Sequence, residues 1–123
     1  MKLSKAEEQL MEIIWKYEKV FMKEIIDNYP EPKPAGTTIA TLLKRMQNKG
    51  VVAYNLFGNS RQYYPLVKKD DYFTKHFREI VKDFFGNSAL QFASFFTTTS
   101  NLSAKELEEL KKIVEQEIER KKQ

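Results

Sequence analysis

The segment from residue 34 to residue 50, PAGTTIATLLKRMQNKG, constrains the fold most, because its pattern is that of one helix with two different faces. Four apolar residues recur at the spacing of a buried helical stripe: Ile39, Leu42, Leu43 and Met46. The opposite face is hydrogen-bonding and basic, and it lacks carboxylates: Thr37, Thr41, Lys44 and Asn48. Gly36 or Thr37 is suited to cap the start of this helix, and Gly50 to end it with a left-handed residue.

Basic charge is concentrated around this helix. Between Pro32 and Lys69 the chain has seven basic residues and no Asp or Glu: Lys33, Lys44, Arg45, Lys49, Arg61, Lys68 and Lys69. The rest of the chain has 21 − 7 = 14 basic and 17 acidic residues, so the net charge of +4 comes from this span. A local basic patch favours phosphate binding, although a solvated charged face gives the same composition. A reader of a DNA groove and an ordinary surface helix are both consistent with the pattern so far.

Two helices are predicted before this segment. Ser4 and Glu7 match a capping box, which predicts that the first helix starts at Ser4. Its apolar stripe is predicted to consist of Ala6, Leu10, Ile13, Ile14 and Tyr17, with Trp15 beside it. A short second helix is predicted over residues 21–29, because three prolines at positions 30, 32 and 34 disfavour helix in the residues before them.

After Gly50 the period changes from that of a helix to that of strands. Residues 51–54 and 62–64 are rich in β-forming side chains, and the turn residues Gly58, Asn59 and Ser60 lie between them. Three helices followed by a hairpin is the pattern of a winged helix-turn-helix domain, whose third helix enters the major groove while the wing lies along the backbone. We therefore expect residues 1–69 to form a winged-helix DNA-binding domain, mainly α with a small β-hairpin wing, in which Arg61 faces phosphate.

The remaining residues, 70–123, have the pattern of amphipathic helices with a phenylalanine-rich face. Helices are predicted from Tyr72, around Leu90 to Phe96 and after Ser103, with residues 97–101 as a loop. A core of about fifty residues is marginal alone, so we expect a second copy of the segment to cover the apolar faces. The alternative is that these helices pack back on the winged domain. The predicted dimerisation residues are Phe73, Phe77, Ile80, Phe84, Phe92, Phe95, Phe96, Leu107, Leu110 and Val114.

Composition argues against several functional classes. The chain has no cysteine, no signal-peptide core and no apolar run long enough for a bilayer, so a cytoplasmic protein without membrane insertion is expected. A catalytic motif is also lacking, and the single histidine, His76, has no neighbouring partners for acid–base chemistry or metal binding. We expect neither an enzyme nor a bound cofactor or metal.

Several motifs in order resemble the penicillinase repressor family (BlaI, MecI, CopY). They are LSKAE at residues 3–7 with Ile14-Trp15, TIATLLKRM at 38–46, KGVV at 49–52, QYYPLV at 62–67, and Leu102-Ser103 followed by Glu106, Glu109 and Leu110. The resemblance covers nearly the whole chain. It implies a cytoplasmic dimeric repressor that binds an inverted-repeat operator through an N-terminal winged helix.

By position, the resemblance implies that Thr37, Thr38 and Thr41 face DNA, and Arg45 matches a family arginine. The helical wheel sets Arg45 between the two faces of the helix, so that a phosphate contact and an internal tie are both open for it. The copper-responsive branch has a C-terminal cysteine cluster, which this chain lacks. The β-lactam branch is induced through a membrane sensor-protease pathway and cleavage at an Asn-Phe bond. The nearest matches here are Ser94-Phe95 and Phe95-Phe96, so this chain departs from the family at that site.

The function predicted from the sequence is a homodimeric repressor on an inverted repeat of double-stranded DNA, with proteolysis in the C-terminal segment as a candidate route of induction. Its predicted DNA-binding residues are Thr37, Thr38, Thr41, Lys44, Arg45, Asn48, Lys49 and Arg61. Two alternatives belong to other classes. One is a winged-helix module for protein interaction, and the other is a regulator with a small-ligand pocket lined by the C-terminal phenylalanines.

Overall fold

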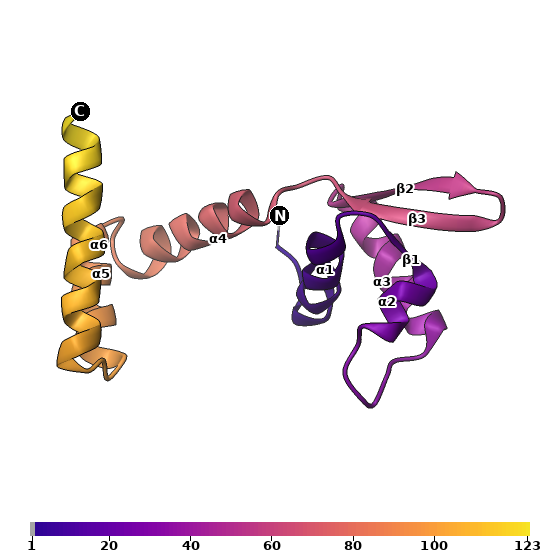
Figure 1. Cartoon of the computed structure of the whole chain (residues 1–123), viewed down its shortest axis with the longest axis horizontal. Coiled ribbons are helices and arrows are strands. Elements are labelled where there is room, and N and C mark those ends of the chain that lie inside the picture. Colours follow the sequence, from indigo (N-terminus) through magenta and orange to yellow (C-terminus); the bar gives the residue numbers. More distant parts are fainter. Residues whose placement is uncertain (1) are drawn as a thin grey trace. The chain divides into compact units, whose positions relative to one another are not determined.

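The computed structural model describes residues 2–123, and the chain divides into two compact units, Met1–His76 and Phe77–Gln123. The first unit contains helices α1, α2 and α3 and a three-stranded antiparallel sheet, with the helices gathered on one side of the sheet (Figure 1). The second unit is helical. The predicted class, mainly α with a small β wing, is confirmed.

Helix α1 (Lys5–Tyr17) begins at the predicted capping box. Ser4 N donates to Glu7 Oε1 at 2.8 Å, and Glu7 N donates to Ser4 Oγ at 3.2 Å. The buried face is rotated from the predicted stripe, because the Glu7 side chain turns into the domain: Glu7, Leu10, Met11 and Ile14 are buried. Ala6 and Tyr17, both predicted to lie inward, are exposed.

A two-residue strand, β1 (Val20–Phe21), was missed by the sequence prediction. It pairs with the third strand, Val20 opposite Tyr63 and Phe21 opposite Gln62. Because β1 takes Phe21 into the sheet, helix α2 (Met22–Asp27) starts one residue later than predicted, and it also ends two residues earlier, with Asn28 as its C-cap. Glu24 Oε1 accepts a hydrogen bond from Phe21 N at 2.9 Å, which ties the strand to the start of the helix.

Helix α3 (Gly36–Asn48) is the helix predicted from residues 34–50, and its four stripe residues are buried as predicted. The predicted start is wrong in detail: Ala35 is the N-cap and makes no side-chain cap, while Gly36 is the first helical residue. The predicted end is confirmed. Gly50 has φ +78°, and Val51 N donates to Met46 O at 3.1 Å, which closes the helix with a left-handed residue.

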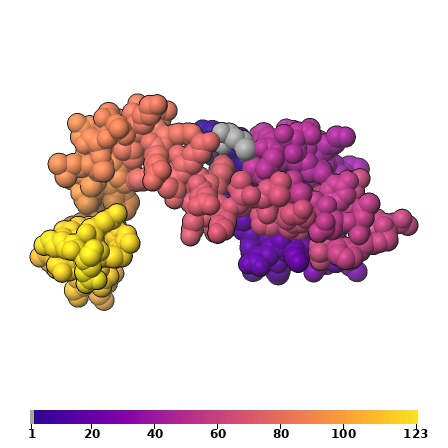
Figure 2. All heavy atoms as spheres, turned by 90° about the horizontal axis from the view of Figure 1, so that it is seen from above, coloured from indigo at the N-terminus to yellow at the C-terminus, as the bar shows by residue number. Residues whose placement is uncertain are grey.

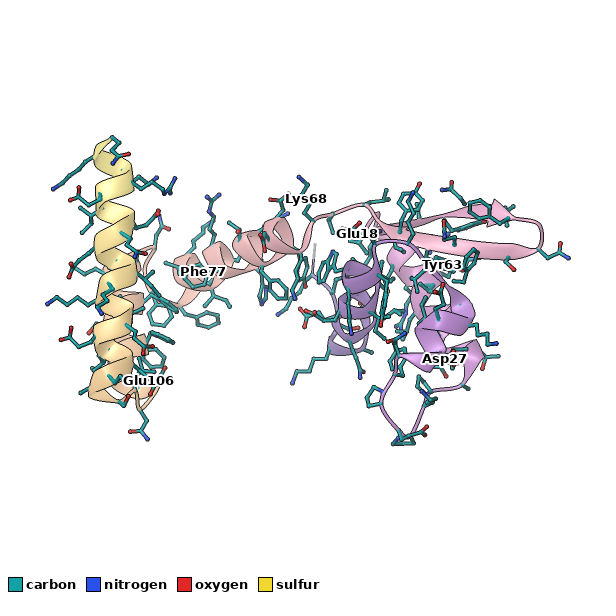
Figure 3. All side chains as sticks on the ribbon, viewed as in Figure 1. Glu18, Asp27, Tyr63, Lys68, Phe77 and Glu106 are labelled. Carbon is teal, nitrogen blue, oxygen red and sulfur yellow. The ribbon has the colours of Figure 1, made fainter. Side chains whose placement is uncertain are left out.

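The wing is formed by β2 (Val52–Phe57) and β3 (Ser60–Pro65), and the strand order is β1-β3-β2. Alternate residues of the sheet, Val20, Val52 and Tyr63, point toward the helices and are buried. Figure 3 places Tyr63 where the sheet meets the helices, and Figure 2 shows the helices and strands of this unit (indigo to magenta) as one filled body. The core members are Leu3, Leu10, Met11, Ile14, Val20, Ile25, Tyr29, Ile39, Leu42, Leu43, Met46, Val51, Val52 and Tyr63.

The first unit ends seven residues beyond the predicted boundary at 69, inside helix α4 (Lys69–Phe84). The first turns of α4 are attached to α1 by aromatic and polar contacts. The Trp15 ring lies 5.9 Å from the Tyr72 ring, and Trp15 Nε1 donates to Val67 O at 2.9 Å. Tyr72 Oη donates to Glu8 Oε2 at 2.9 Å. These side chains tie the start of α4 to the first unit.

The second unit contains the end of α4, α5 (Ala89–Thr99) and α6 (Ala104–Lys122). The capping box predicted at Ser103 and Glu106 is present, and Figure 3 shows Glu106 in the first turn of α6. The predicted loop over residues 97–101 is wrong at its start, because α5 continues to Thr99. Thr97 Oγ1 donates to Ala93 O at 2.9 Å and Thr98 Oγ1 to Ser94 O at 2.8 Å, so both hydroxyl groups are satisfied within the helix.

The second unit leaves most of its apolar side chains exposed. Val81 is its single buried residue among those described, and neither α5 nor α6 has a buried residue. The phenylalanines contact one another edge to face, with ring centroids 4.8 Å apart for Phe77 and Phe92 and 5.5 Å for Phe85 and Phe92. No helix within residues 2–123 is both long enough and apolar enough to cross a membrane.

Candidate nucleic-acid interface

The outer face of α3 carries the polar residues that the sequence predicted there. The predicted set Thr37, Thr38, Thr41, Lys44, Arg45 and Asn48 is exposed, on the side of α3 opposite its buried stripe. Thr41 Oγ1 donates its hydrogen to Thr37 O at 3.0 Å. The hydroxyl proton is therefore occupied inside the helix, and Thr41 offers outward only a methyl group and acceptor lone pairs.

Arg61 projects from β3 of the wing and is supported by an aromatic ring. Its guanidinium carbon lies 4.4 Å from the centroid of the Tyr54 ring, and that ring lies 5.6 Å from the buried Tyr63 ring. Stacking on Tyr54 limits the rotamers of Arg61, while its side chain stays exposed to an approaching anion. The wing thus presents an exposed, pre-organised cation.

The seven basic residues of the carboxylate-free span have different roles. Lys33 Nζ donates to the carbonyl oxygens of Ile26, Asp27 and Tyr29 at 3.2, 3.0 and 2.9 Å, which caps the end of α2. Lys69 Nζ pairs with Glu12 at 3.0 Å on the surface. Within residues 2–123, Lys44 and Arg45 form no salt bridge, so their charges are available to a partner.

Lys49, predicted as a DNA contact, is directed into the protein. Its Nζ lies 2.7 Å from Glu7 Oε1 and donates to Lys2 O at 3.2 Å. The Glu7 side chain is 2% exposed. Burial alone would raise the pKa of the Glu7 carboxyl, but the hydrogen bonds from Lys49 and Ser4 outweigh burial and hold that pKa below its ordinary value. The second carboxylate oxygen, Oε2, is buried without a hydrogen-bond partner in the described structure.

Two apolar wing residues were missed by the sequence analysis. Leu56 and Phe57 at the end of β2 are 62% and 56% exposed, and the Phe57 ring contacts Phe21 of β1 edge to face at 6.0 Å. The signal was present, since a strand that extends beyond residue 54 must place apolar side chains at the wing tip. The wing therefore offers an apolar edge beside Arg61, because Leu56 lies directly opposite Arg61 in the pairing of β2 with β3.

The residues predicted for dimerisation are mostly exposed in the single chain. Phe84 is 78% exposed, and Phe95, Val114 and Phe77 are about half exposed, at 52%, 51% and 46%. Phe73 belongs to the first unit, where its ring lies 5.9 Å from Trp15. The candidate cleavage positions, Ser94, Phe95 and Phe96, lie within helix α5.

No group of three or more metal-binding side chains occurs among residues 2–123. His76, which the sequence left without partners, stacks on the Tyr72 ring at 6.3 Å. Both observations concern the part of the chain that the structure describes. The chemistry that the surface offers is therefore that of hydrogen bonds, cations and apolar edges.

The three-helix core, the wing formed by β2 and β3 after it, and the polar face of α3 define a winged-helix protein. The solution structure of the DNA-binding domain of the repressor BlaI has the same fold, with a TM-score of 0.52 and 29% sequence identity over 58% of this chain and 88% of that chain. The penicillinase repressor family model matches residues 3–116, so the chain belongs to that family.

Two repressor relatives match this chain over almost their whole length. The penicillinase repressor of Bacillus licheniformis is 27% identical over 122 residues, which cover 98% of this chain and 95% of the relative. The methicillin resistance regulatory protein MecI of Staphylococcus aureus strain N315 is 28% identical over 113 residues, covering 91% and 92%. The family resemblance predicted from the motifs is confirmed.

Proposed function

We propose that this protein is a transcriptional repressor that binds an inverted-repeat operator as a homodimer, with α3 of each protomer in the major groove. The observation that carries the proposal is the exposed face of α3, which has hydrogen-bonding and cationic side chains and no carboxylate. The repressor names of the relatives and the DNA-binding title of the BlaI structure support it.

Base reading is assigned to the threonines at the front of α3. Thr37, Thr38 and Thr41 lie in its first two turns, where a recognition helix meets base edges. Because Thr41 donates to Thr37 O, it meets a base through its methyl group or as an acceptor. A thymine methyl or an exocyclic amino group of cytosine or adenine fits those properties.

Phosphate binding is assigned to the free cations and to one amide. Lys44 projects from the second half of α3, Arg45 and Asn48 from its last turn, and Arg61 from the wing. Lys49 is left out of this set, because Glu7 and Lys2 O occupy its ammonium group. Each phosphate that a cation neutralises contributes about −0.9 to the slope of log affinity against log salt.

The second unit is assigned to self-association. Helices α4, α5 and α6 leave several large apolar side chains exposed, and a second copy would cover them by two-fold symmetry. Two linked binding domains gain affinity from effective concentration, by a factor of about 10²–10⁴. Separation of the dimer therefore releases DNA.

Induction by proteolysis, the finer part of the sequence prediction, requires α5 to open. Proteases cleave extended segments, and Ser94, Phe95 and Phe96 are helical with their carbonyls in the helix ladder. Thr98 Oγ1 donates to Ser94 O at 2.8 Å and adds to that ladder. A membrane sensor-protease pathway would act on this chain only after local unfolding of α5.

Fluorescence anisotropy with a labelled duplex tests DNA binding. The duplex is a sequence selected by the protein from a random library, and a scrambled duplex is the comparison. We expect tighter binding to the selected duplex and weakening of both complexes as salt rises. Lys44→Met and Arg61→Met should each reduce the salt slope by about one and weaken both duplexes alike. Binding that does not respond to salt, or does not distinguish the two duplexes, contradicts the proposal and favours a protein-interaction module.

A further inference from the structure

The contact between Glu7 and Lys49 joins the ends of two helices. Glu7 is in the first turn of α1, and Lys49 is the C-cap of α3, 42 residues later. The two helices lie side by side in Figure 1 and pack against each other. Lys49 Nζ also donates to Lys2 O at 3.2 Å, so one ammonium group links the α3 terminus to both the side chain and the backbone at the start of the chain.

The end of α3 has no other charged attachment among residues 2–123. Beyond Lys49 the chain turns at Gly50, whose φ is +78°, and enters β2. The apolar stripe fixes which face of α3 is buried, but apolar contacts permit small shifts along the helix axis, because dispersion forces are not directional. A charge-assisted hydrogen bond of 2.7 Å at the helix end is directional and restricts such shifts.

Stability alone does not account well for this pair. A buried carboxylate is costly to desolvate, and Glu7 Oε2 is buried without a partner among the described residues. An apolar pair of similar size would fill the space at a lower cost. The best-attested role of buried charged groups is to fix one arrangement of two structural elements, and this pair joins two helices.

We propose that Glu7 is a positioning residue for DNA reading, which acts through Lys49 to fix the depth and tilt of α3. This inference rests on the proposed function. It assigns selectivity to a buried residue on a different helix, which is not itself part of the exposed face of α3. It also gives Lys49 the role of holding α3 in its reading position, whereas the sequence pattern suggested that Lys49 contacts phosphate.

The test compares Glu7→Gln, Lys49→Met and the double variant with Lys44→Met, which removes a free lysine from the same helix. Affinities for the selected and scrambled duplexes are measured at several salt concentrations, on samples shown to be folded by circular dichroism. We expect Glu7→Gln and Lys49→Met each to lower the ratio of selected to scrambled affinity about tenfold, the size of one lost base contact. The double variant should be no worse than either, and Lys49→Arg should restore most of the ratio.

The salt slope separates positioning from phosphate contact. Under this proposal Glu7→Gln and Lys49→Met leave the slope unchanged, whereas Lys44→Met lowers it by about one. If Lys49 contacts phosphate, Lys49→Met lowers the slope, and Glu7→Gln, which frees the ammonium, tightens binding to every duplex. That opposite behaviour overturns the proposal.

Two further outcomes are distinct. The variants can lose melting temperature while their ratio of selected to scrambled affinity stays within twofold of the wild-type ratio. The pair then only stabilises the fold, and this result also overturns the proposal. If Lys49→Met does not fold, the isosteric Glu7→Gln carries the comparison. Failure of the proposed function appears earlier, as wild-type protein without salt-dependent DNA binding, and removes the basis for positioning.

Discussion

At the scale of the residue, contacts rather than composition decide what each cation does. Seven basic residues surround α3 in the sequence, but Lys33, Lys49 and Lys69 are engaged with carbonyl or carboxylate oxygens of the chain itself. Lys44 and Arg45 remain available on α3, and Arg61 is stacked on Tyr54. A count of basic residues therefore overestimates the number of phosphate contacts.

Thr41 gives a prediction about base contact. Thr41→Ser keeps the acceptor oxygen and removes the methyl group, whereas Thr41→Val keeps a methyl group and removes the oxygen. We expect one of the two to relax base preference at a single position of the half-site by about 1–3 kcal/mol, with little loss on scrambled DNA. Competition binding with single-base variants of the selected duplex measures the change. Equal losses on selected and scrambled DNA would rule out base reading by Thr41.

Glu7 gives a prediction about pH. Its pKa is lowered in the folded protein, so the stabilisation that its ionised form supplies is complete above the ordinary glutamate pKa of about 4.3 and is lost as pH falls toward the folded pKa. We expect Glu7→Gln to be less stable than wild type by about 1–3 kcal/mol at pH 7, below the full cost of a broken buried pair because Lys49 is partly exposed.

Urea unfolding at pH 7 and at pH 3.5 tests this. The difference between wild type and Glu7→Gln should shrink at the lower pH, because below the ordinary glutamate pKa the unfolded chain takes up a proton more readily than the folded protein does. Glu12→Gln is the control, since its pair with Lys69 is exposed and should contribute little at either pH. A difference that is the same at both pH values would contradict the assignment.

At the scale of the element, periodicity predicted the long elements well and the short ones poorly. The stripe of α3, the two capping boxes and the left-handed end at Gly50 follow from local patterns, and all are present. Strand β1 could not be predicted, because two residues carry no period and the strand exists only through its pairing with Tyr63 and Gln62. A run of Thr and Ser residues favours a loop locally, but Thr97 is helical and its hydroxyl group donates to Ala93 O within the helix.

Substitution of the two glycines at the ends of α3 is predicted to change stability in opposite directions. Gly36 is the first helical residue, and an added Cβ would lie 3.8 Å from Ile26 Cδ1, an ordinary contact, so Gly36→Ala should stabilise by about 0.5–1 kcal/mol. Gly50 has φ +78° with open space around it, so Gly50→Ala meets only backbone strain and should destabilise by about 1–2 kcal/mol. Urea unfolding gives both values, and changes of the same sign would contradict the backbone argument.

At the scale of the whole molecule, the two units differ in how far each is complete as a single chain. The winged unit has a core to which α1, α2, α3 and the sheet all contribute buried side chains. The second unit has edge-to-face phenylalanine contacts but almost no buried side chain among those described. The sequence analysis expected a second copy to cover these faces, and most of the residues that it named for dimerisation are exposed in the single chain.

Self-association is predicted to depend on α6. Val114 is 51% exposed, so Val114→Lys should separate the dimer, whose mass of about 29 kDa is 2 × 14.5 kDa, into monomers. Leu66→Lys is the matched control, because Leu66 is similarly exposed, at 53%, but belongs to the winged unit. Sedimentation velocity at micromolar concentration measures both masses. A wild-type mass of one chain would contradict the dimer.

The measurement that tests the central claim most directly is selection of sequences from a random duplex library by the wild-type protein, followed by sedimentation of the selected complex. The account predicts an enriched inverted repeat, two chains bound to each duplex, and affinity that falls as salt rises. Enrichment of no sequence, or one chain on a site without two-fold symmetry, would contradict the reading of DNA by paired α3 helices.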